Sequence, residues 1–255
     1  MGSLQPLFSG SSGNAVLVKN KENALLVDAG VSGKRILEAL SAYHQTGSTL
    51  SGILITHEHI DHIRSVGMMA RKFHLPIYAS HGTWRAMAPM IGDVSVSLVR
   101  EFTPDVPFEI GDIRVTPFSI PHDAAEPVGF TFETERKKTA LCTDVGAMSE
   151  KIFLRLSGSE EVLLESNYDI VMLQKGPYPY HLKKRILGEN GHLSNKEAAT
   201  VCARLACLGT KKIILGHLSH ENNTPQLAYE VAKLYIENCG IEVGRDIRLS
   251  VANRA

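Results

Sequence analysis

This 255-residue sequence has few cysteines and no long apolar segment, and its charges balance. The four cysteines show no C-x-x-C spacing and have apolar neighbours, which predicts reduced core thiols and argues against a disulfide framework. Lysine plus arginine equals aspartate plus glutamate at 27 each, so the overall charge predicts neither nucleic-acid nor membrane binding. No apolar stretch approaches the roughly 20 residues that span a bilayer, and the N-terminus lacks a basic-then-apolar signal. We therefore expect a cytoplasmic protein without a membrane anchor.

The residues that are present fit one folded unit. Hydrophobic residues make up 44% of the chain, which is enough to fill a sizeable core at this length. The chain contains no repeat, no low-complexity tract and no linker between periodic segments. These features predict a single domain over residues 1–255.

A cluster of histidines is the most informative segment. It follows the apolar run Ile53–Thr56 and places three imidazoles and a carboxylate within six residues, His57-Glu58-His59-Ile60-Asp61-His62. Alternate side chains of a strand share a face, so His57 and His59 can reach one metal ion. Asp61 and His62 lie where the chain turns toward a helix, and they can reach a second ion. Imidazole with carboxylate suits zinc, manganese or iron, and the absence of cysteine argues against a structural zinc knuckle.

The H-x-H-x-D-H pattern resembles the metallo-β-lactamase superfamily, and that family's other landmarks follow in order. Asp28 begins an Asp-Ala-Gly motif, and His122 follows the apolar run Ile113–Ile120. Asp144 lies in a Cys-Thr-Asp-Val-Gly segment, and His217 lies in a Leu-Gly-His-Leu-Ser segment. The resemblance implies an α/β fold, the αββα sandwich, in which two mixed β-sheets are flanked by helices and the metal site lies along one edge.

The same resemblance implies two divalent metal ions per chain, either Zn²⁺ or Mn²⁺. The implied ligands are His57, His59 and His122 for one ion and Asp61, His62 and His217 for the other, with Asp144 bridging both. It also implies that Asp28 orients an imidazole such as His57 or His59 and raises its basicity.

The spacing of apolar residues predicts the elements of such a sandwich. Predicted strands are Ala15–Val18, Leu25–Val27, Ile53–Thr56, Pro76–Ala79, Val96–Val99, Ile113–Ser119, Gly129–Glu133, Thr139–Thr143, Val162–Glu165 and Lys212–Leu215. Predicted helices are Gly33–Ala42, Ile63–Phe73, Thr83–Met90, Ser149–Leu156, Asn195–Leu208 and Thr224–Asn238. Ser194, followed three residues later by Glu197, predicts a capping box at the start of one helix.

Two features limit which of this superfamily's reactions we expect the chain to catalyse. The resembling lactamases carry a Cys where this chain has Asp144, and the oxygen-reducing branch carries a Glu where it has His59, so oxidation is disfavoured. Glu165 and His192 follow the order of the ribonuclease Z-like phosphodiesterases, in which a Glu-oriented His protonates the leaving oxygen. The alternative is that His192 only caps a helix and Glu165 is solvated.

Several segments resemble one bacterial branch, the YycJ/WalJ-like metallo-hydrolases. They are Phe8–Asn14, Pro121–Ala124, Glu165–Asp169, Gly191–Asn195 and His217–Asn223. The resemblance implies a 5′-to-3′ exonuclease on double-stranded DNA, in which a metal-bridging hydroxide attacks phosphorus. The catalytic residues that it implies are Asp61, His192 and Glu165. The chain lacks the inserted domain of the β-CASP nucleases and an obvious tRNA-gripping arm, which disfavours RNA processing.

Two polar segments are candidate substrate contacts. Ser11, Ser12 and Asn14 lie in a Gly/Ser-rich stretch that could cradle a phosphate, although an ordinary hairpin turn explains it equally well. Lys183, Lys184 and Arg185 lie in a segment that also carries two tyrosines, which suits phosphate contact with base or sugar stacking. A solvated helix face is the alternative for these cations.

Two other classes of function stay open. A small-molecule thioester or lactone hydrolase resembling glyoxalase II uses a similar ligand set, but its good leaving groups would not need Glu165 and His192. A metal-bound scaffold or sensor without turnover is the other alternative, and the intact ligand set argues against it.

Overall fold

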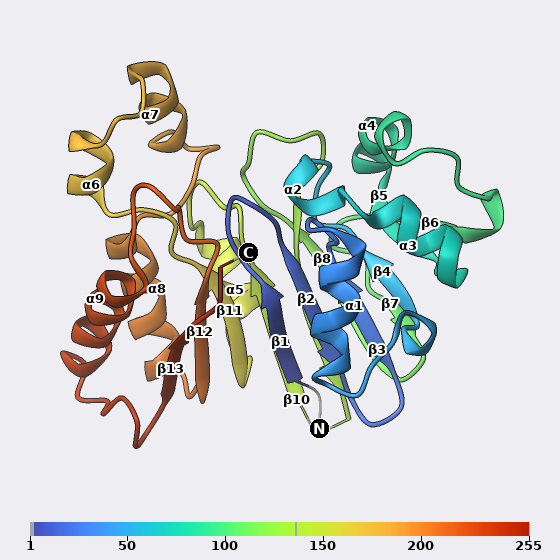
Figure 1. Ribbon diagram of the computed structural model, residues 1–255. Coiled ribbons are helices and arrows are strands. Elements are labelled where there is room, and N and C mark those ends of the chain that lie inside the picture. The colour runs from blue at the N-terminus through green and yellow to red at the C-terminus, as the bar shows by residue number, and fades with distance from the viewer. Residues whose placement is uncertain (1–2, 136, 255) are drawn as a thin grey trace.

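Two β-sheets lie face to face between layers of helices in the computed structural model, which describes residues 3–135 and 137–254 (Figure 1). The six-stranded sheet has the order β1 (Ser3–Phe8), β2 (Ala15–Lys19), β3 (Ala24–Val27), β4 (Gly52–Leu54), β5 (Ile77–Ser80) and β6 (Val99–Phe102). The seven-stranded sheet has the order β13 (Arg248–Val251), β12 (Lys212–Gly216), β11 (Glu161–Glu165), β10 (Lys137–Cys142), β9 (Val128–Thr134), β8 (Ile113–Ser119) and β7 (Phe108–Ile110). Each sheet pairs parallel strands at one side with antiparallel strands at the other. The predicted αββα sandwich is confirmed.

The central strands are apolar on both faces because each face meets a different layer. In β3, Leu25 and Val27 face the space between the sheets, whereas Leu26 packs toward the outer helices. In β11, Leu163 joins the inter-sheet core and Val162 faces the opposite way. A strand buried on both sides reads as a continuous apolar run, which is why these strands could be predicted from sequence.

Helices cover both outer faces. The six-stranded sheet carries α1 (Gly33–Ser41), α3 (Val66–Phe73) and α4 (His81–Ile91), and the seven-stranded sheet carries α5 (Glu150–Leu156), α8 (Asn195–Cys207) and α9 (Pro225–Glu237). The short helices α2 (Ile60–Ile63), α6 (Ile170–Lys175) and α7 (Tyr180–Ile186) lie beyond the upper ends of the sheets in Figure 1. In residues 3–135 and 137–254, no helix has the length and apolar content needed to cross a bilayer.

Two predicted elements were wrong in detail. Val96–Val99 is not a strand: Val96–Leu98 form a 3-10 turn, as do Gly47–Thr49, and β6 begins only at Val99. The predicted helix Ile63–Phe73 begins earlier and is divided at Ser65 into α2 and α3. The division has a local cause, because the Ser65 N–H donates to the Ala29 carbonyl and its hydroxyl donates to the Val31 carbonyl. The capping box of Ser194 and Glu197 at the start of α8 is confirmed.

Candidate metal centre

The predicted ligands converge at one edge of the sandwich, where strands of both sheets end. Asp28 follows β3, Asp144 lies just beyond β10, Glu165 ends β11 and His217 follows β12. Three of these residues have left-handed backbones, with φ of 60° at Asp28, 57° at Asp144 and 53° at His217. Such conformations are uncommon outside glycine and concentrate at functional sites. Three of these four strands are thus followed by a sharp turn that carries a site residue.

Close backbone packing joins the Asp-Ala-Gly motif to the histidine cluster. The Ala29 N–H donates to the His62 carbonyl at 2.7 Å, and the Asn14 N–H donates to the Asp61 carbonyl at 2.8 Å. A Cβ atom on Gly30 would lie 1.5 Å from the Asp61 carbonyl oxygen. Only glycine therefore allows this contact, which fixes where Asp61 and His62 lie.

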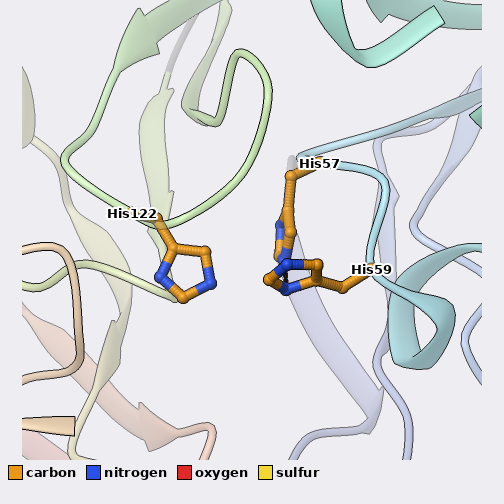
Figure 2. A group of neighbouring side chains, drawn as sticks. All are labelled: His57, His59 and His122. Atoms are coloured by element: carbon orange, nitrogen blue, oxygen red, sulfur yellow. Dashed lines mark hydrogen bonds between the residues drawn. The ribbon is translucent and has the colours of Figure 1, made fainter. Parts of the chain in front are cut away.

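One group of imidazoles comes from two loops on facing sheets. Figure 2 shows His57 and His59 opposite His122, and the three offer ligand atoms within 4.8 Å of one another. The Nε2 atom of His57 lies 3.0 Å from Nδ1 of His59. The expectation that these two residues share the face of a strand was wrong, because β4 ends at Leu54 and both lie in the loop before α2.

Contacts at the Nδ1 atoms of His57 and His122 leave the Nε2 atoms of these two rings as ligand atoms. His122 donates from Nδ1 to the Gly191 carbonyl at 3.2 Å, and His57 Nδ1 lies 3.0 Å from the Thr56 hydroxyl. Burial lowers the pKa of His57 well below its ordinary value, and neighbouring imidazoles lower it further. Burial also lowers the pKa of His122. Both rings are therefore neutral, which is the form that binds a metal ion.

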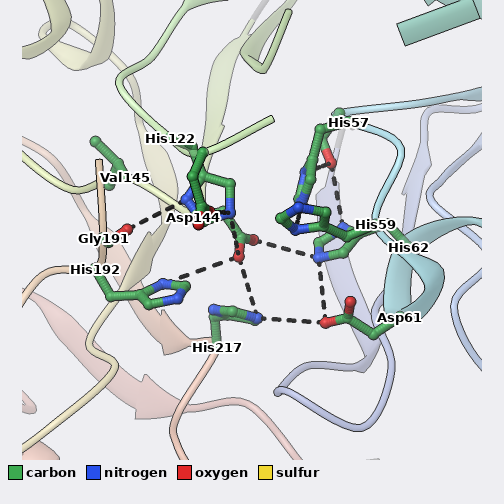
Figure 3. Close-up of polar contacts among 12 residues, drawn as sticks. His57, His59, Asp61, His62, His122, Asp144, Val145, Gly191, His192 and His217 are labelled. Carbon is green, nitrogen blue, oxygen red and sulfur yellow. Dashed lines mark hydrogen bonds and ion pairs between the residues drawn. The ribbon is translucent and has the colours of Figure 1, made fainter. Parts of the chain in front are cut away.

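A second group, formed by Asp61, His62 and His217, lies beside the first, and Asp144 lies between the two groups (Figure 3). The Oδ2 atom of Asp61 lies 3.6 Å from Nε2 of His62 and 3.9 Å from Nε2 of His217. Asp144 contacts His62 and His217 at 3.4 Å each and His122 at 3.8 Å. Its carboxylate thus reaches both groups, as a bridging ligand must.

In the absence of a cation, the neighbouring carboxylates keep His62 and His217 protonated. Burial alone would lower the pKa of His62, but Asp28 and Asp144 outweigh it and raise that pKa to about 9. Burial is likewise outweighed at His217, whose pKa the Asp144 and Asp61 carboxylates raise well above its ordinary value. Burial would raise the pKa of Asp61, but its interaction with the protonated His217 ring and the charge of His62 lower it. Buried negative charge here calls for a compensating cation.

Orphaned polar atoms show that the residues present fit metal ions. In the described part of the chain, Nε2 of His122, Nε2 of His217 and Oδ2 of Asp144 are buried without a hydrogen-bond partner. Leaving each such atom unsatisfied costs about 1–3 kcal/mol. All three point into the space between the two groups, and the donors are nitrogen and oxygen only. That donor set suits zinc or manganese.

Asp28 occupies a different place from the one expected. It was predicted to orient His57 or His59, but its Oδ2 atom accepts from Nδ1 of His62 at 2.8 Å. It also accepts from the Thr56 hydroxyl at 2.8 Å and the Thr56 N–H at 2.9 Å, so it reaches His57 only through Thr56. Sequence analysis missed Thr56, because a Thr at the end of an apolar run is typical of any strand.

Glu165 holds two imidazoles at once. The carboxylate is fully buried, and its Oε1 atom lies 2.8 Å from Nδ1 of both His192 and His217. Oε2 accepts from the N–H groups of Val145 at 3.0 Å and Leu193 at 3.1 Å. The predicted pairing with His192 is therefore present, and the alternative of a solvated Glu165 is excluded. The helix cap is Ser194, not His192.

The candidate contacts in the Gly/Ser-rich stretch divide between surface and interior. Ser11 and Ser12 are exposed, whereas Asn14 is buried. The Asn14 amide oxygen accepts from the Gly10 N–H, and its Nδ2 atom lies 3.0 Å from Nε2 of His62. Asn14 thus belongs to the wall of the second group.

The three candidate cations of α7 also differ. Lys183 donates to the carbonyls of Gln174 and Gly176 at 2.8 Å each, which closes the end of α6. Lys184 is exposed. Arg185 pairs with Asp123, the residue next to His122. Sequence analysis missed Asp123, although its position beside a predicted ligand was a usable signal.

Comparison with known proteins agrees with this geometry. Residues 23–218 match the family model for the beta-lactamase superfamily domain, and the chain belongs to this superfamily. It is 41% identical over 238 residues to the exodeoxyribonuclease YycJ of Bacillus anthracis, covering 93% of this chain and 90% of that protein. It is 39% identical over 245 residues to the exodeoxyribonuclease WalJ of Streptococcus pneumoniae, covering 95% and 91%.

A solved structure shares the whole fold. The metallo-beta-lactamase fold protein YhfI from Bacillus subtilis aligns with a TM-score of 0.76 and 16% identity, covering 99% of this chain and 97% of that one. The predicted family is confirmed, and the chain is a metal-dependent hydrolase that uses divalent metal.

Proposed function

We propose that this chain is a metal-dependent nuclease that degrades double-stranded DNA from the 5′ end. The observation that carries the proposal is the Glu165–His192 pair, because His192 Nδ1 lies 4.0 Å from the Asp144 carboxylate. A proton donor beside the metal ligands is what a phosphodiester requires, since its leaving alkoxide is a strong base. The exodeoxyribonuclease names of YycJ and WalJ support the same substrate class.

The proposed ligands form two sites that share one carboxylate. They are His57, His59 and His122 for one ion and Asp61, His62 and His217 for the other, with Asp144 bridging and Asp28 orienting His62. When bound, divalent ions here would lower the pKa of water and neutralise charge on phosphate oxygens. Glu165 and Asp28 fix the imidazoles of His217 and His62 through Nδ1, so that Nε2 of each ring would be the atom that binds a metal ion.

His192 is the proposed proton donor. Its Nδ1–H donates to Glu165, which leaves Nε2 directed away from the carboxylate, and its side chain is 18% exposed. The position of Glu165 fixes the orientation of the ring. A donor placed in this way accelerates the chemical step by on the order of 10²- to 10⁴-fold.

The proposed DNA contacts are local, because the overall charge is zero. They are the exposed residues Ser11, Ser12, Lys184 and Arg185, whereas Asn14 and Lys183, also predicted, bond to the neighbouring backbone. Cations close to the phosphates act within a Debye length of about 8–10 Å, so a local patch suffices. We further propose that the chain works as one domain in the cytoplasm, where its DNA substrate is found. The inter-sheet core, which joins strands from both halves of the sequence, supports the single domain.

The test is a gel assay of purified protein loaded separately with Mn²⁺ or Zn²⁺. The substrate is duplex DNA that carries a label at the 5′ or the 3′ end, and Asp61→Ala serves as the inactive control. We expect mononucleotide release from the 5′ label, lost in Asp61→Ala while the variant's circular dichroism stays native. Release from the 3′ label first would overturn the polarity, and internal fragments would overturn the exonuclease mode.

A further inference from the structure

An ion pair holds Arg185 at the edge of the metal centre. Asp123 follows the ligand His122, and its Oδ1 atom lies 3.4 Å from Nε2 of His122. The other oxygen of Asp123 accepts the Nε–H of Arg185. One carboxylate therefore contacts both a proposed metal ligand and a guanidinium group from α7.

The ion pair with Asp123 leaves the outer face of the Arg185 guanidinium available to bind another group. Only Nε of Arg185 bonds to Asp123, and within residues 3–135 and 137–254 no acceptor bonds to its two terminal nitrogens. The Arg185 side chain is 54% exposed. The hydrogen bond to Asp123 raises the pKa of the Arg185 guanidinium, and the charge of Asp61 adds to this effect. Arg185 thus lies within the field of Asp61, a residue of the second ligand group.

The segment that carries Arg185 is also fixed to the other reactive groups. The carbonyl of Ile186, the next residue, accepts the His192 N–H at 3.1 Å. The carbonyl of Gly191 accepts from His122 Nδ1 at 3.2 Å. Arg185, His192 and His122 therefore keep a set arrangement relative to one another.

We propose that Arg185 binds a non-bridging oxygen of the phosphate at the metal centre, and that Asp123 is the positioning residue that holds it there. The proposal rests on the proposed phosphodiesterase function and deepens it by assigning phosphate recognition to one cation. A planar guanidinium matches the geometry of phosphate oxygens, whereas an ammonium group is only a point charge. Its tether at Nε reduces the conformational freedom lost on binding. Lys183, by contrast, already donates to two carbonyls.

The ordinary alternative is a surface ion pair with no role, and such pairs contribute little to stability. A second alternative is that Asp123 binds a metal ion directly, given its distance from His122 Nε2. The two alternatives and the proposal differ in what Asp123→Ala does to metal content and to phosphate binding.

The experiment measures inorganic phosphate binding by calorimetry to Mn²⁺-loaded protein, with metal content determined on the same samples. The variants are Arg185→Ala, Arg185→Lys, Asp123→Ala and the double variant Asp123→Ala/Arg185→Ala. Arg114→Ala is the matched control, because Arg114 is an exposed arginine at the opposite end of the strand that leads to His122. Phosphate binding needs no turnover, so wild-type protein that binds phosphate but leaves DNA intact would refute the nuclease and not this proposal.

We expect Arg185→Ala to weaken phosphate binding by on the order of 10- to 100-fold, the value of a charge-assisted hydrogen bond. Metal content should not change, Arg185→Lys should restore little, and Arg114→Ala should bind like wild type. Asp123→Ala should weaken binding in the wild-type background and have no further effect in Arg185→Ala. Unchanged phosphate affinity in Arg185→Ala would overturn the contact. Loss of metal in Asp123→Ala, or an equal loss of phosphate affinity in both backgrounds, would overturn the positioning role.

Discussion

Replacing Glu165 with glutamine tests how the site is built, because the change keeps the shape and removes the charge. The carboxylate accepts four hydrogen bonds, from two imidazoles through Oε1 and from two backbone N–H groups through Oε2. An amide has one accepting oxygen, so one pair of donors must face an NH₂ group. Two buried donors lose their acceptors, which costs about 2–6 kcal/mol in the free energy of unfolding.

The orientation of the amide decides which function is lost. If the NH₂ group faces the imidazoles, Nδ1 of His192 and of His217 must accept a hydrogen bond from it. Both neutral rings then carry their proton on Nε2. Nε2 of His217 would then have no lone pair with which to bind a metal ion, and metal affinity should fall about 10- to 100-fold. If the NH₂ faces the backbone, the N–H groups of Val145 and Leu193 lose their acceptor, and the position of His192, next to Leu193, is no longer fixed. In both cases cleavage should fall by on the order of 10²- to 10⁴-fold.

The assay combines chelator competition for metal affinity, DNA cleavage and thermal unfolding. Glu161→Gln is the control, because Glu161 is a buried, ion-paired glutamate at the other end of the same strand. It should lower the unfolding temperature and leave metal affinity and specific activity unchanged. If Glu165→Gln protein bound metal and cleaved DNA within threefold of wild type, the assigned role of Glu165 would be refuted.

Two further predictions follow from the same contacts. His192→Ala should slow cleavage by on the order of 10²- to 10⁴-fold with unchanged metal content, measured by cleavage kinetics and elemental analysis, and lost metal would contradict a pure proton-donor role. The metal-free protein should lose stability as pH rises from 6.5 to about 9, because His62 has a raised folded pKa and its contribution is complete only below its ordinary value of 6.5. The loss is up to about 1.4 kcal/mol per pH unit for each such histidine. Metal displaces these protons, so the difference in unfolding temperature between loaded and metal-free protein should widen over this range, and a constant difference in calorimetry would contradict the assignment.

The convergence of the proposed metal ligands could be predicted because each of these residues lies in a short motif near the end of an apolar run. A strand followed by an Asp or His is a local pattern, and the family landmarks gave the order. The contacts between motifs could not be predicted in the same way. Glu165 shares one oxygen between His192 and His217, and Asp28 contacts His62, because of how the two sheets face each other. The local sequence does not encode how close these side chains lie to one another, because that depends on how the two sheets pack.

The fold was predictable where strands are buried on both faces and harder to predict at the margins. Strands β1, β7 and β13 were missed because they lie at sheet edges, where Pro6 or alternating exposed residues interrupt the apolar run. Helices α6 and α7 were missed because each is short and has a single buried residue, Leu173 or Ile186, so that no apolar stripe marks it. One signal was available: the Asp169 side chain caps α6 by accepting from Val171 and Met172 N–H groups.

A comparison of two substrates shows whether this metal centre cleaves phosphodiesters. A single Mn²⁺-loaded preparation is given duplex DNA in one reaction and a small thioester in another, each with and without chelator. We expect chelator-sensitive DNA cleavage and little thioester hydrolysis, because Glu165 and His192 serve a poor leaving group. Rapid thioester hydrolysis with intact DNA would contradict it and identify a small-molecule hydrolase instead.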